Sequence, residues 1–329
     1  MKVLVTGGAG YIGSTLVRLL AERGHDVTVF DRFLFGREPL LEVSDKIHMI
    51  EDDTRELQPY VLKGIEAVID MAALSNDPSG ELDAQKTLDI NYKARARIAR
   101  LAKEAGARKY VLASSCSVYG ASNEIVSETS AVNPQTTYAR ANILWENDAL
   151  PLADKDFHVT VLRQATCYGF SYRMRFDLAI NGMVLGFFKN GKIPIMKDGS
   201  QWRPFVHVKD TSAAFIKTIE EESDKYGREI FNVGEPAQNY QIFPLAKLVA
   251  ESCGIPFEYE WYGQADTRNY RVNFDKISSA MDFRPKFTAS EGAQEIFAAL
   301  NDGRLRPDDP KTITVGWYKH LIETARLNL

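Results

Sequence analysis

The chain has 329 residues, of which 45% are hydrophobic and 26% charged, so it holds enough apolar material for a sizeable core and two domains. The net charge of -4 argues against nucleic acid as the main partner, because phosphate backbones require clustered Lys and Arg. We expect a cytoplasmic protein without membrane attachment, since no stretch approaches the roughly 18 apolar residues of a membrane span and no basic leader precedes the first strand. The 3 cysteines and 5 histidines lack ligand spacing, so neither a disulfide nor a metal site is predicted.

The first predicted elements are a strand at residues 3–5 and a helix at residues 14–23. Between them lie Gly7, Gly10 and Gly13. The first glycine permits a sharp turn, the second lets backbone N–H groups approach a pyrophosphate, and the third lets the helix lie close to the strand. The helix N-terminus then faces the phosphates. This pattern predicts a dinucleotide-binding site.

A second strand is predicted at residues 26–30 and is followed by Asp31. An acidic residue at this distance from the glycines accepts hydrogen bonds from the adenosine ribose and repels a 2′-phosphate, so the predicted cofactor is NAD rather than NADP. The neighbouring Arg32 favours NADP instead, because its guanidinium can approach such a phosphate.

Strand and helix patterns continue to alternate through the first half. Further strands are predicted at residues 47–50, 67–71, 110–114 and 159–163, and helices at residues 87–105 and 138–153. Repeated units of this kind imply a Rossmann-like, doubly wound parallel sheet of the α/β class, which binds ligands at the carboxyl ends of its strands. Arg95, Arg97 and Arg100 in the first of these helices are interpreted as a solvated face or a dimer contact.

After Gln164 the pattern changes to loops and shorter elements, which predicts a smaller α/β substrate domain. Residues 205–208, 210–222 and 230–233 are typical of a return to the first sheet, so we expect that domain to be discontinuous. We assign residues 1–163 and about 203–234 to the NAD-binding domain, and about 164–202 and 235–329 to the substrate domain.

Several residues that follow predicted strands carry a resemblance to a known family. They are the three glycines of the turn together with Asp31, Asp53, Ala72, Ala73, Ser115, Tyr138 and Arg203. Over nearly its whole length the chain resembles the extended short-chain dehydrogenase/reductases, specifically the nucleotide-sugar epimerases and dehydratases. The resemblance implies NAD as cofactor and a nucleotide-diphosphate sugar as substrate, linked to UDP, GDP, CDP or dTDP. It also implies a homodimer, formed in many relatives by the helices near residues 87–105 and 138–153.

The resemblance assigns catalytic roles to Ser115 and Tyr138, which would flank the sugar hydroxyl being oxidised. Tyr138, as a phenolate, would take the hydroxyl proton while hydride passes to NAD. The implied activity is epimerisation through transient oxidation of a sugar hydroxyl to a ketone, with the 4-position favoured. A dehydratase, a 4-ketoreductase or dehydrogenase, and a nonenzymatic dinucleotide sensor are the alternatives.

Position 142 departs from the family pattern, which places a lysine four residues after the tyrosine where this chain has Asn142. Free tyrosine titrates near pH ~10, so a base at neutral pH needs a phenolate stabilised by about three units, or roughly 4 kcal/mol. A lysine charge about 4 Å away supplies roughly that much at an effective dielectric near 20, whereas an amide offers only a dipole. We therefore expect a variant with reduced activity in which Asn142 still bonds the nicotinamide ribose.

Three accounts of Asn142 remain open at this point. It is an engineered substitution that traps substrate, a natural variant that relies on the positive charge of the oxidised nicotinamide, or the mark of a protein that binds without turnover.

Cys116 and Ser117 occupy the positions at which hexose 4,6-dehydratases of this family carry an Asp-Glu pair. Neither residue replaces a carboxylate, so epimerisation outranks dehydration. Cys116 is a candidate acid or base at a sugar carbon, and the alternative is a small residue packed behind the site.

The remaining candidates come from the same resemblance and from positions that follow strands. Toward the cofactor they are Tyr11, Ile12, Asp53, Thr54, Ala72 and Ala73, and toward the substrate they are Ser75, Asn76, Gln164, Thr166, Asn181, Arg203 and Arg268. Asp53 matches a residue that accepts from the adenine amino group, with a solvated acidic loop as the alternative. Arg203 and Arg268 are expected to bind the diphosphate, since forked guanidinium groups suit phosphate, and the Asn181 amide would contact the same phosphates. Arg173 and Arg175 are further anion candidates or a charged loop.

Overall fold

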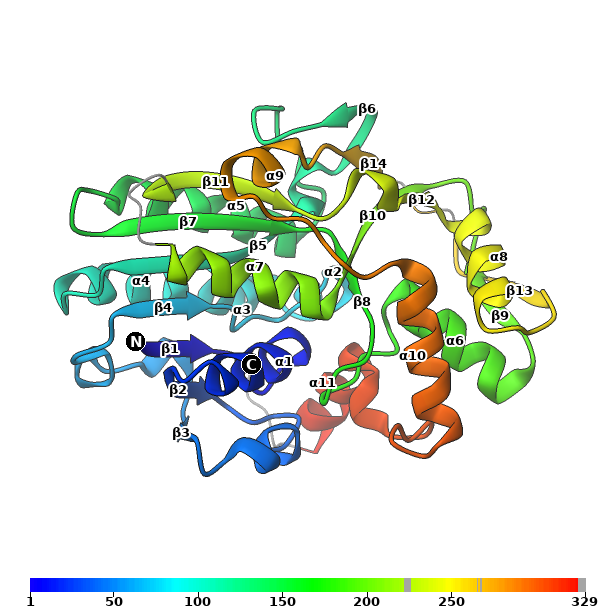
Figure 1. Cartoon of the computed structure of the whole chain (residues 1–329), viewed down its shortest axis with the longest axis horizontal. Coiled ribbons are helices and arrows are strands. Elements are labelled where there is room, and N and C mark those ends of the chain that lie inside the picture. The colour runs from blue at the N-terminus through cyan, green and yellow to red at the C-terminus, as the bar shows by residue number, and fades with distance from the viewer. Residues whose placement is uncertain (222–225, 265, 267, 325–329) are drawn as a thin grey trace.

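The computed structural model describes residues 1–221, 226–264, 266 and 268–324, and within them a seven-stranded sheet dominates the fold (Figure 1). Its strands pair in parallel in the order β11-β7-β5-β4-β1-β2-β3. Their bounds are β1 (Lys2–Thr6), β2 (Asp26–Asp31), β3 (Ile47–Glu51), β4 (Ala67–Asp70), β5 (Lys109–Ser115), β7 (His158–Gln164) and β11 (Arg228–Val233). The strand order reverses between β1 and β4, which marks the point where such sheets bind ligands. The predicted Rossmann-like, doubly wound α/β fold is confirmed.

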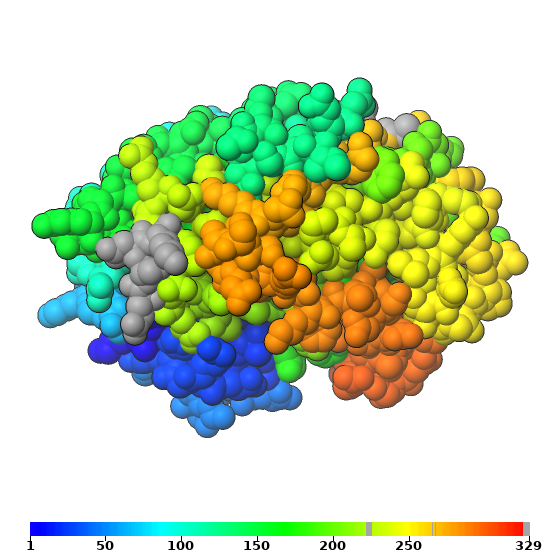
Figure 2. All heavy atoms as spheres, turned by 45° about the horizontal axis from the view of Figure 1, so that its top comes forward, coloured from blue at the N-terminus to red at the C-terminus, as the bar shows by residue number. Residues whose placement is uncertain are grey.

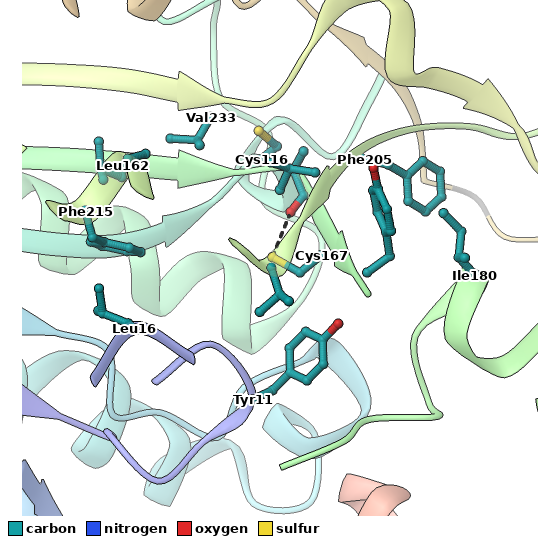
Figure 3. Close-up of a cluster of buried hydrophobic side chains, with 14 of the residues drawn as sticks. Tyr11, Leu16, Cys116, Leu162, Cys167, Ile180, Phe205, Phe215 and Val233 are labelled. Carbon is teal, nitrogen blue, oxygen red and sulfur yellow. Dashed lines mark hydrogen bonds between the residues drawn. The ribbon is translucent and has the colours of Figure 1, made fainter. Parts of the chain in front are cut away.

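Helices cover both faces of this sheet, and the strands are apolar on both sides for that reason. The covering helices are α1 (Tyr11–Glu22) and α7 (Val208–Glu220) on one face, and α4 (Arg95–Glu104) and α5 (Thr137–Ala149) on the other. Along β1, Val3 and Val5 join the core cluster that contains Leu16 of α1, whereas Leu4 joins the cluster that contains Trp145 of α5. Figure 3 shows part of the first cluster, including Leu16.

The helix predicted over residues 87–105 is interrupted. The structure has α3 (Ala84–Leu88), then a π-helical turn (Asp89–Ala94), and only then α4. Within the π turn, the Asn91 side chain accepts from the Leu74 amide at 2.9 Å and donates to the Leu74 carbonyl at 3.2 Å. Such turns insert one residue into a helix and are frequent near functional sites, and no periodicity of apolar residues announces them.

Two other predicted elements differ from the structure. Helix α5 ends at Ala149 rather than at residue 153, because Pro151 lacks the N–H that would continue the helix. The expectation that residues 205–208 return to the first sheet is wrong. They belong to β10 (Trp202–His207), which pairs with β8 (Thr166–Tyr168), whereas β11 does return and pairs with β7. An apolar run predicts a strand but does not identify the neighbour with which it pairs.

Smaller elements complete the fold, and Figure 1 shows α6, α8 and α10 beside β9 and β13, beyond the carboxyl ends of the main strands. They are β6 (Ala121–Val126), β9 (Ile193–Met196), β12 (Asn239–Gln241), β13 (Tyr259–Tyr262), β14 (Asn269–Val272), α2 (Asp77–Gly80), α6 (Ala179–Asn190), α8 (Ile242–Ser252), α9 (Asp275–Met281), α10 (Ala289–Asn301) and α11 (Thr314–Glu323). Figure 2 shows the yellow α8–β13 segment at one end of the surface, apart from the blue N-terminal segment. The exact division into two domains stays a prediction. In the part of the chain that the structure describes, no helix is long and apolar enough to cross a membrane.

Candidate active site

A cavity of about 680 Å³ lies where β1, β4 and β5 end, between the main sheet and the smaller elements. This volume falls within the usual range for small-molecule sites. The glycine turn and Ser115 line it from the sheet, and Arg203 and Arg268 line it from the opposite side. Elements from distant parts of the sequence thus enclose one space at the position expected for a ligand of a doubly wound sheet.

The glycine turn forms a cradle that side chains would fill. Gly7 has a φ of +70°, and a Cβ added there would lie 2.9 Å from the backbone of Ala72. A Cβ on Gly13 would lie 2.3 Å from the Gly7 carbonyl oxygen. Gly7, Gly10 and Gly13 all line the cavity, as do Tyr11 and Ile12 at the start of α1. A backbone cradle at a helix N-terminus fits the pyrophosphate of a dinucleotide.

Asp31 lies at the end of β2 and lines the same cavity. Its carboxylate accepts from the backbone N–H groups of Ala9 at 3.0 Å and Phe33 at 2.8 Å. Burial raises the pKa of Asp31, and these two backbone hydrogen bonds oppose that shift. The Arg32 guanidinium is paired with Asp53 at 3.2 Å, so the positive charge that would favour a 2′-phosphate already has a counter-ion.

Asp53 is held by two arginines rather than standing free in a loop. Its second partner is Arg55, whose Nη2 lies 2.8 Å from Asp53 Oδ2. Although burial acts to raise the pKa of Asp53, its bonds to Arg55 and the charge of Arg32 hold it below the usual value. Asp53 lines the cavity as a carboxylate, together with Thr54, Ala72 and Ala73 as predicted.

The predicted catalytic pair faces this same cavity. Ser115 is the last residue of β5, and its Oγ accepts from the Ser117 amide at 3.1 Å. The Thr136 side chain caps α5 by accepting from the Ala139 amide at 3.1 Å, which places Tyr138 in the first turn of that helix. The structure thus brings Ser115 and Tyr138 to one cavity, and their catalytic roles stay a prediction.

Several groups act on the Tyr138 phenol. Burial raises its pKa, and the Asp77 carboxylate acts in the same direction. The nearby Asn142 amide and the guanidinium groups of Arg95 and Arg175 act to lower it. A phenol that must act as a base therefore depends on positive charge gathered around it.

Asn142 is fully buried, and neither polar atom of its amide has a hydrogen-bond partner. It stands behind the cavity wall rather than in it, because it has no exposed surface and is absent from the lining. The expected bond between Asn142 and the nicotinamide ribose stays a prediction. Position 142 supplies a buried dipole and no charge.

Cys116 does not reach the cavity. Its side chain is 1% exposed, its Sγ donates to the Arg163 carbonyl at 3.2 Å, and burial raises the pKa of the thiol well above its usual value. Figure 3 shows Cys116 among apolar side chains that include Leu162 and Val233. The packed-residue alternative fits this geometry, and we carry no catalytic role for Cys116 forward.

Asn181 also differs from its expected role of contacting substrate phosphates. It is fully buried in α6, where its Oδ1 accepts from the Gly169 amide at 3.0 Å. Its Nδ2 donates to the Arg175 carbonyl at 2.8 Å and to the Tyr11 hydroxyl at 3.2 Å. With its amide used in this way, Asn181 fixes the chain beside the cavity instead of lining it.

Arg203 and Arg268 come together as predicted and share one counter-ion. Nη2 of each lies 2.7 Å from Oδ2 of Asp266. Arg268 also pairs through Nη1 with Asp77 of α2, so it joins the two sides of the cavity. Adjacent guanidinium groups held by carboxylates form a site that a diphosphate fits by replacing those carboxylates.

The loop that precedes α2 meets the other side of this site. Ser75 and Asn76 line the cavity; the Asn76 amide donates to Asp177 at 2.8 Å, and the Ser75 carbonyl accepts from Arg175 Nη1 at 2.9 Å. Arg175 in turn pairs with Asp177 at 2.8 Å. These contacts order the loop, and they show that Arg175 belongs to a buried network rather than to a charged surface loop.

Gln164 and Thr166 line the cavity between β7 and β8, as predicted. The side-chain oxygen Oε1 of Gln164 accepts from the Thr211 hydroxyl at 2.6 Å, which fixes the orientation of the side-chain amide.

Sequence reasoning missed several residues of the lining, among them Asp77, Asp266 and Tyr318. Asp266 lies two residues before Arg268, a spacing at which a carboxylate readily pairs with the arginine it precedes. Tyr318 belongs to α11, which reaches the cavity from the far end of the chain, and no local pattern predicts that contact. Within the described ranges, no cluster of three or more His, Cys, Asp or Glu could hold a metal ion.

Known proteins are similar to this chain in sequence and in architecture. The NAD dependent epimerase/dehydratase family matches residues 3–234. The chain is 30% identical to a UDP-glucose 4-epimerase of Mycolicibacterium smegmatis, over 89% of this chain and 96% of that one. It is 25% identical to UDP-glucuronic acid decarboxylase 1 of Arabidopsis thaliana, over 94% of this chain and 72% of the other.

A similar solved structure is that of MoeE5 in complex with UDP-glucose and NAD, which is 28% identical to this chain with a TM-score of 0.81 and covers 93% of this chain and 100% of that one. The family match spans most of the main sheet and includes the glycine cradle, Ser115 and Tyr138. The chain therefore belongs to the NAD-dependent epimerase/dehydratase family, and it is an enzyme that uses NAD.

Proposed function

We propose that this enzyme is a nucleotide-sugar epimerase that inverts a ring carbon, with the 4-position favoured, through transient oxidation of its hydroxyl to a ketone. One observation carries the proposal: Ser115 and Tyr138 line the same cavity as a backbone cradle for a dinucleotide and a pair of arginines suited to a diphosphate. A nucleotide sugar held by those arginines extends its sugar toward the two hydroxyl groups.

The residues of the chain divide the chemistry between them. The Ser115 hydroxyl holds the oxygen of the sugar hydroxyl, and the Tyr138 oxygen accepts its proton as the ketone forms. NAD, held by the glycine cradle and Asp31, would supply the acceptance and return of the hydride at that carbon. Tyr138 then gives its proton back to the oxygen of the ketone once the other face of the sugar is presented. Net oxidation is zero, so no second substrate is required.

Dehydration fits this cavity less well. Elimination of water needs an acid–base pair that acts on the sugar. Cys116 and Ser117 stand where the resemblance places the Asp-Glu pair of the dehydratases, neither carries a carboxylate, and the Cys116 thiol bonds the Arg163 carbonyl outside the cavity lining. The alternative of a 4-ketoreductase or dehydrogenase differs from epimerisation only in the fate of the hydride, and product analysis separates them.

We propose UDP as the nucleotide to test first, because the similar proteins named above act on or hold UDP sugars. GDP, CDP and dTDP sugars are the other candidates.

We further propose a cytoplasmic homodimer, which the helices near residues 87–105 and 138–153 would form. The exposed Leu144 on α5, at 40%, supports that surface, and light scattering of the purified chain tests it.

The test of the proposed function combines binding with product analysis. Thermal shifts with UDP, GDP, CDP and dTDP sugars in the presence of NAD identify the nucleotide. Chromatography of the preferred sugar after incubation is expected to show its 4-epimer, with no lasting absorbance of reduced cofactor. Release of a dehydrated sugar, or lasting absorbance, would contradict epimerisation.

A further inference from the structure

Arg95 is a buried cation that the mechanism above does not use. The sequence suggested a solvated helix face or a dimer contact for Arg95, but its side chain is 1% exposed within the single chain. Ile98, Ala99 and Ala102 are buried on the same helix, at spacings of three, four and seven from Arg95. This spacing marks the inward face of α4, so the side chain extends into the protein beneath the sheet. The π-helical turn of residues 89–94 ends directly before it.

The guanidinium is fixed at the carboxyl ends of two strands that lead into the cavity. Its Nη2 donates to the Asp70 carbonyl at the end of β4, at 2.8 Å, and to the Ala113 carbonyl of β5, at 3.3 Å. Ala113 itself lines the cavity, and Ser115 lies two residues further along the same strand. Arg95 therefore lies directly behind the wall that carries the catalytic serine.

The same guanidinium packs against the helix that carries the tyrosine. Its central carbon lies 3.2 Å from the centre of the Trp145 ring. Tyr138, Asn142 and Trp145 follow each other at helical spacings of four and three, so they share one face of α5. A charge stacked on Trp145 is thus on the Tyr138 side of that helix, where position 142 supplies only an amide.

Asp70 is the counter-ion of Arg95, but both of its carboxylate oxygens also accept hydrogen bonds from hydroxyl groups. Its Oδ1 accepts from the Thr6 hydroxyl at 2.5 Å, and its Oδ2 accepts from the Tyr110 hydroxyl. Arg95 Nε lies 3.5 Å from Asp70 Oδ1 and has no hydrogen-bond partner. Asp70 thus faces Arg95 across 3.5 Å without a hydrogen bond to its Nε, and the face of the guanidinium is turned to the Trp145 ring.

We propose that Arg95 is the positioning residue whose buried positive charge, from α4, stabilises the Tyr138 phenolate that α5 leaves without a lysine. The inference rests on the proposed role of Tyr138 as the base. It also explains why Asn142 need not reduce activity: the charge has moved to a different helix. Around Tyr138 the other charged groups are Asp77 with its partner Arg268, Arg175 with Asp177, and Glu81, whose carboxylate accepts from the Thr137 amide. Asp77, Arg268, Arg175 and Asp177 line the cavity, whereas Arg95 lies outside that lining, between the ends of β4 and β5 and the Trp145 ring of α5.

The variant Arg95→Gln tests the charge while keeping an N–H donor for the strand carbonyls. In the NAD-loaded full chain, the ultraviolet difference between each protein and its Tyr138→Phe counterpart reports ionisation of this one phenol. We expect Arg95→Gln to raise the ionisation pH of Tyr138 by about one unit and to shift the rising limb of the kcat profile equally. Arg100→Gln, which removes an exposed cation from the same helix, is the matched control and should change neither.

A rescue variant separates charge from structure. Asn142→Lys introduced into Arg95→Gln should return the ionisation pH toward the wild-type value, and its effect there should exceed its effect in the wild-type background.

Should Arg95→Gln fail to fold, Arg95→Lys, which retains the charge, should keep the wild-type ionisation, and Asn142→Lys combined with Arg95→Met provides the rescue. An unchanged ionisation pH in folded Arg95→Gln, or equal effects of Asn142→Lys in both backgrounds, would overturn the proposal. If neither the wild type nor Arg95→Gln shows an ionisation that Tyr138→Phe abolishes, the proposed role of Tyr138 as the base is contradicted instead.

Discussion

The two ends of the cavity are built from different materials. The phosphate cradle at the cofactor end is made of backbone and small residues of the main sheet, with Gly7 close to Ala72, and Asp31 beside it is held by two backbone N–H groups. The substrate end consists of charged side chains from distant segments, with Arg203 and Arg268 sharing Asp266. The first is shaped before any ligand arrives, because its form belongs to the fold. The second must exchange internal ion pairs for contacts with a diphosphate.

This difference predicts where each kind of substitution acts. Changes at the cofactor end should behave as steric events that block binding, whereas changes at the substrate end should alter affinity for the sugar nucleotide and leave the cofactor unaffected. Tyr138 stands between the two ends and should affect chemistry alone.

The largest effect is expected from Tyr138→Phe, which removes the proposed base between the two ends. We expect kcat to fall by about a thousandfold while NAD and nucleotide-sugar affinities stay within a few-fold, because a positioned base typically contributes this much. Steady-state rates and calorimetric titration measure the two parts. Tyr60→Phe, at an exposed residue, is the control. A large loss of NAD binding in Tyr138→Phe would place that residue in the cofactor site rather than in the chemistry.

Gly13→Ala tests whether the cofactor end is rigid. The new Cβ would lie 2.3 Å from the Gly7 carbonyl oxygen, so the turn must shift, and we expect NAD to bind roughly ten- to a hundredfold more weakly. Gly316→Ala is the matched control, because its nearest neighbour is 3.5 Å away and the residue lies on an exposed helix surface. Titration with NAD checks both. Unchanged NAD affinity in Gly13→Ala would show that the cradle yields to accommodate side chains.

Arg268→Gln tests the exchange of ion pairs at the substrate end. We expect KM for the nucleotide sugar to rise roughly tenfold with little change in NAD affinity, since a charge-assisted bond to phosphate is lost while Asp77 and Asp266 lose one partner. Arg271→Gln provides the control, because Arg271 stacks on Trp202 and bonds the Asn123 carbonyl outside the cavity lining. A change in NAD affinity equal to that in KM would show that the two ends are not separate.

The smallest effect concerns α11, which closes the cofactor end through Tyr318. Burial raises the pKa of Tyr318 to about 12. Below about pH 10 the phenol is protonated in both folded and unfolded chains, and between about pH 10 and pH 12 only the unfolded chain loses the proton, so stability falls in that interval. Urea unfolding at about pH 9 and pH 11 should show a loss that is about 1 kcal/mol smaller in Tyr318→Phe than in the wild type. Equal losses in the two proteins would mean that Tyr318 is hydrated in the folded state.

The same division explains what could be predicted from the sequence. The glycine turn and Asp31 at the cofactor end were predictable, because Gly7, Gly10, Gly13 and Asp31 lie within one strand–helix–strand unit, where spacing along the chain determines position in space. Ser115 and Tyr138 were predictable as well, since each follows or begins an element whose end faces the ligand.

The failures have a common physical origin in tertiary contacts. Cys116 and Asn181 have side chains that suit a catalytic or phosphate-binding role, but packing directs one toward the Arg163 carbonyl and uses the other to hold Gly169. Arginine is rarely buried, so residue type indicates a surface position for Arg95. Its spacing from Ile98 and Ala102 indicates the inward face of the helix, and the structure agrees with the spacing.

The transfer of hydrogen at the sugar carbon tests the central claim most directly. The purified NAD-loaded enzyme is incubated with a nucleotide sugar that carries deuterium at C4, and the product is analysed by mass spectrometry and NMR. We predict the 4-epimer with deuterium retained at C4, because in the proposed reaction the hydride that leaves C4 is the one returned to it. A 4-epimer whose C4 position has lost its deuterium, or a product changed only at another carbon, would contradict it.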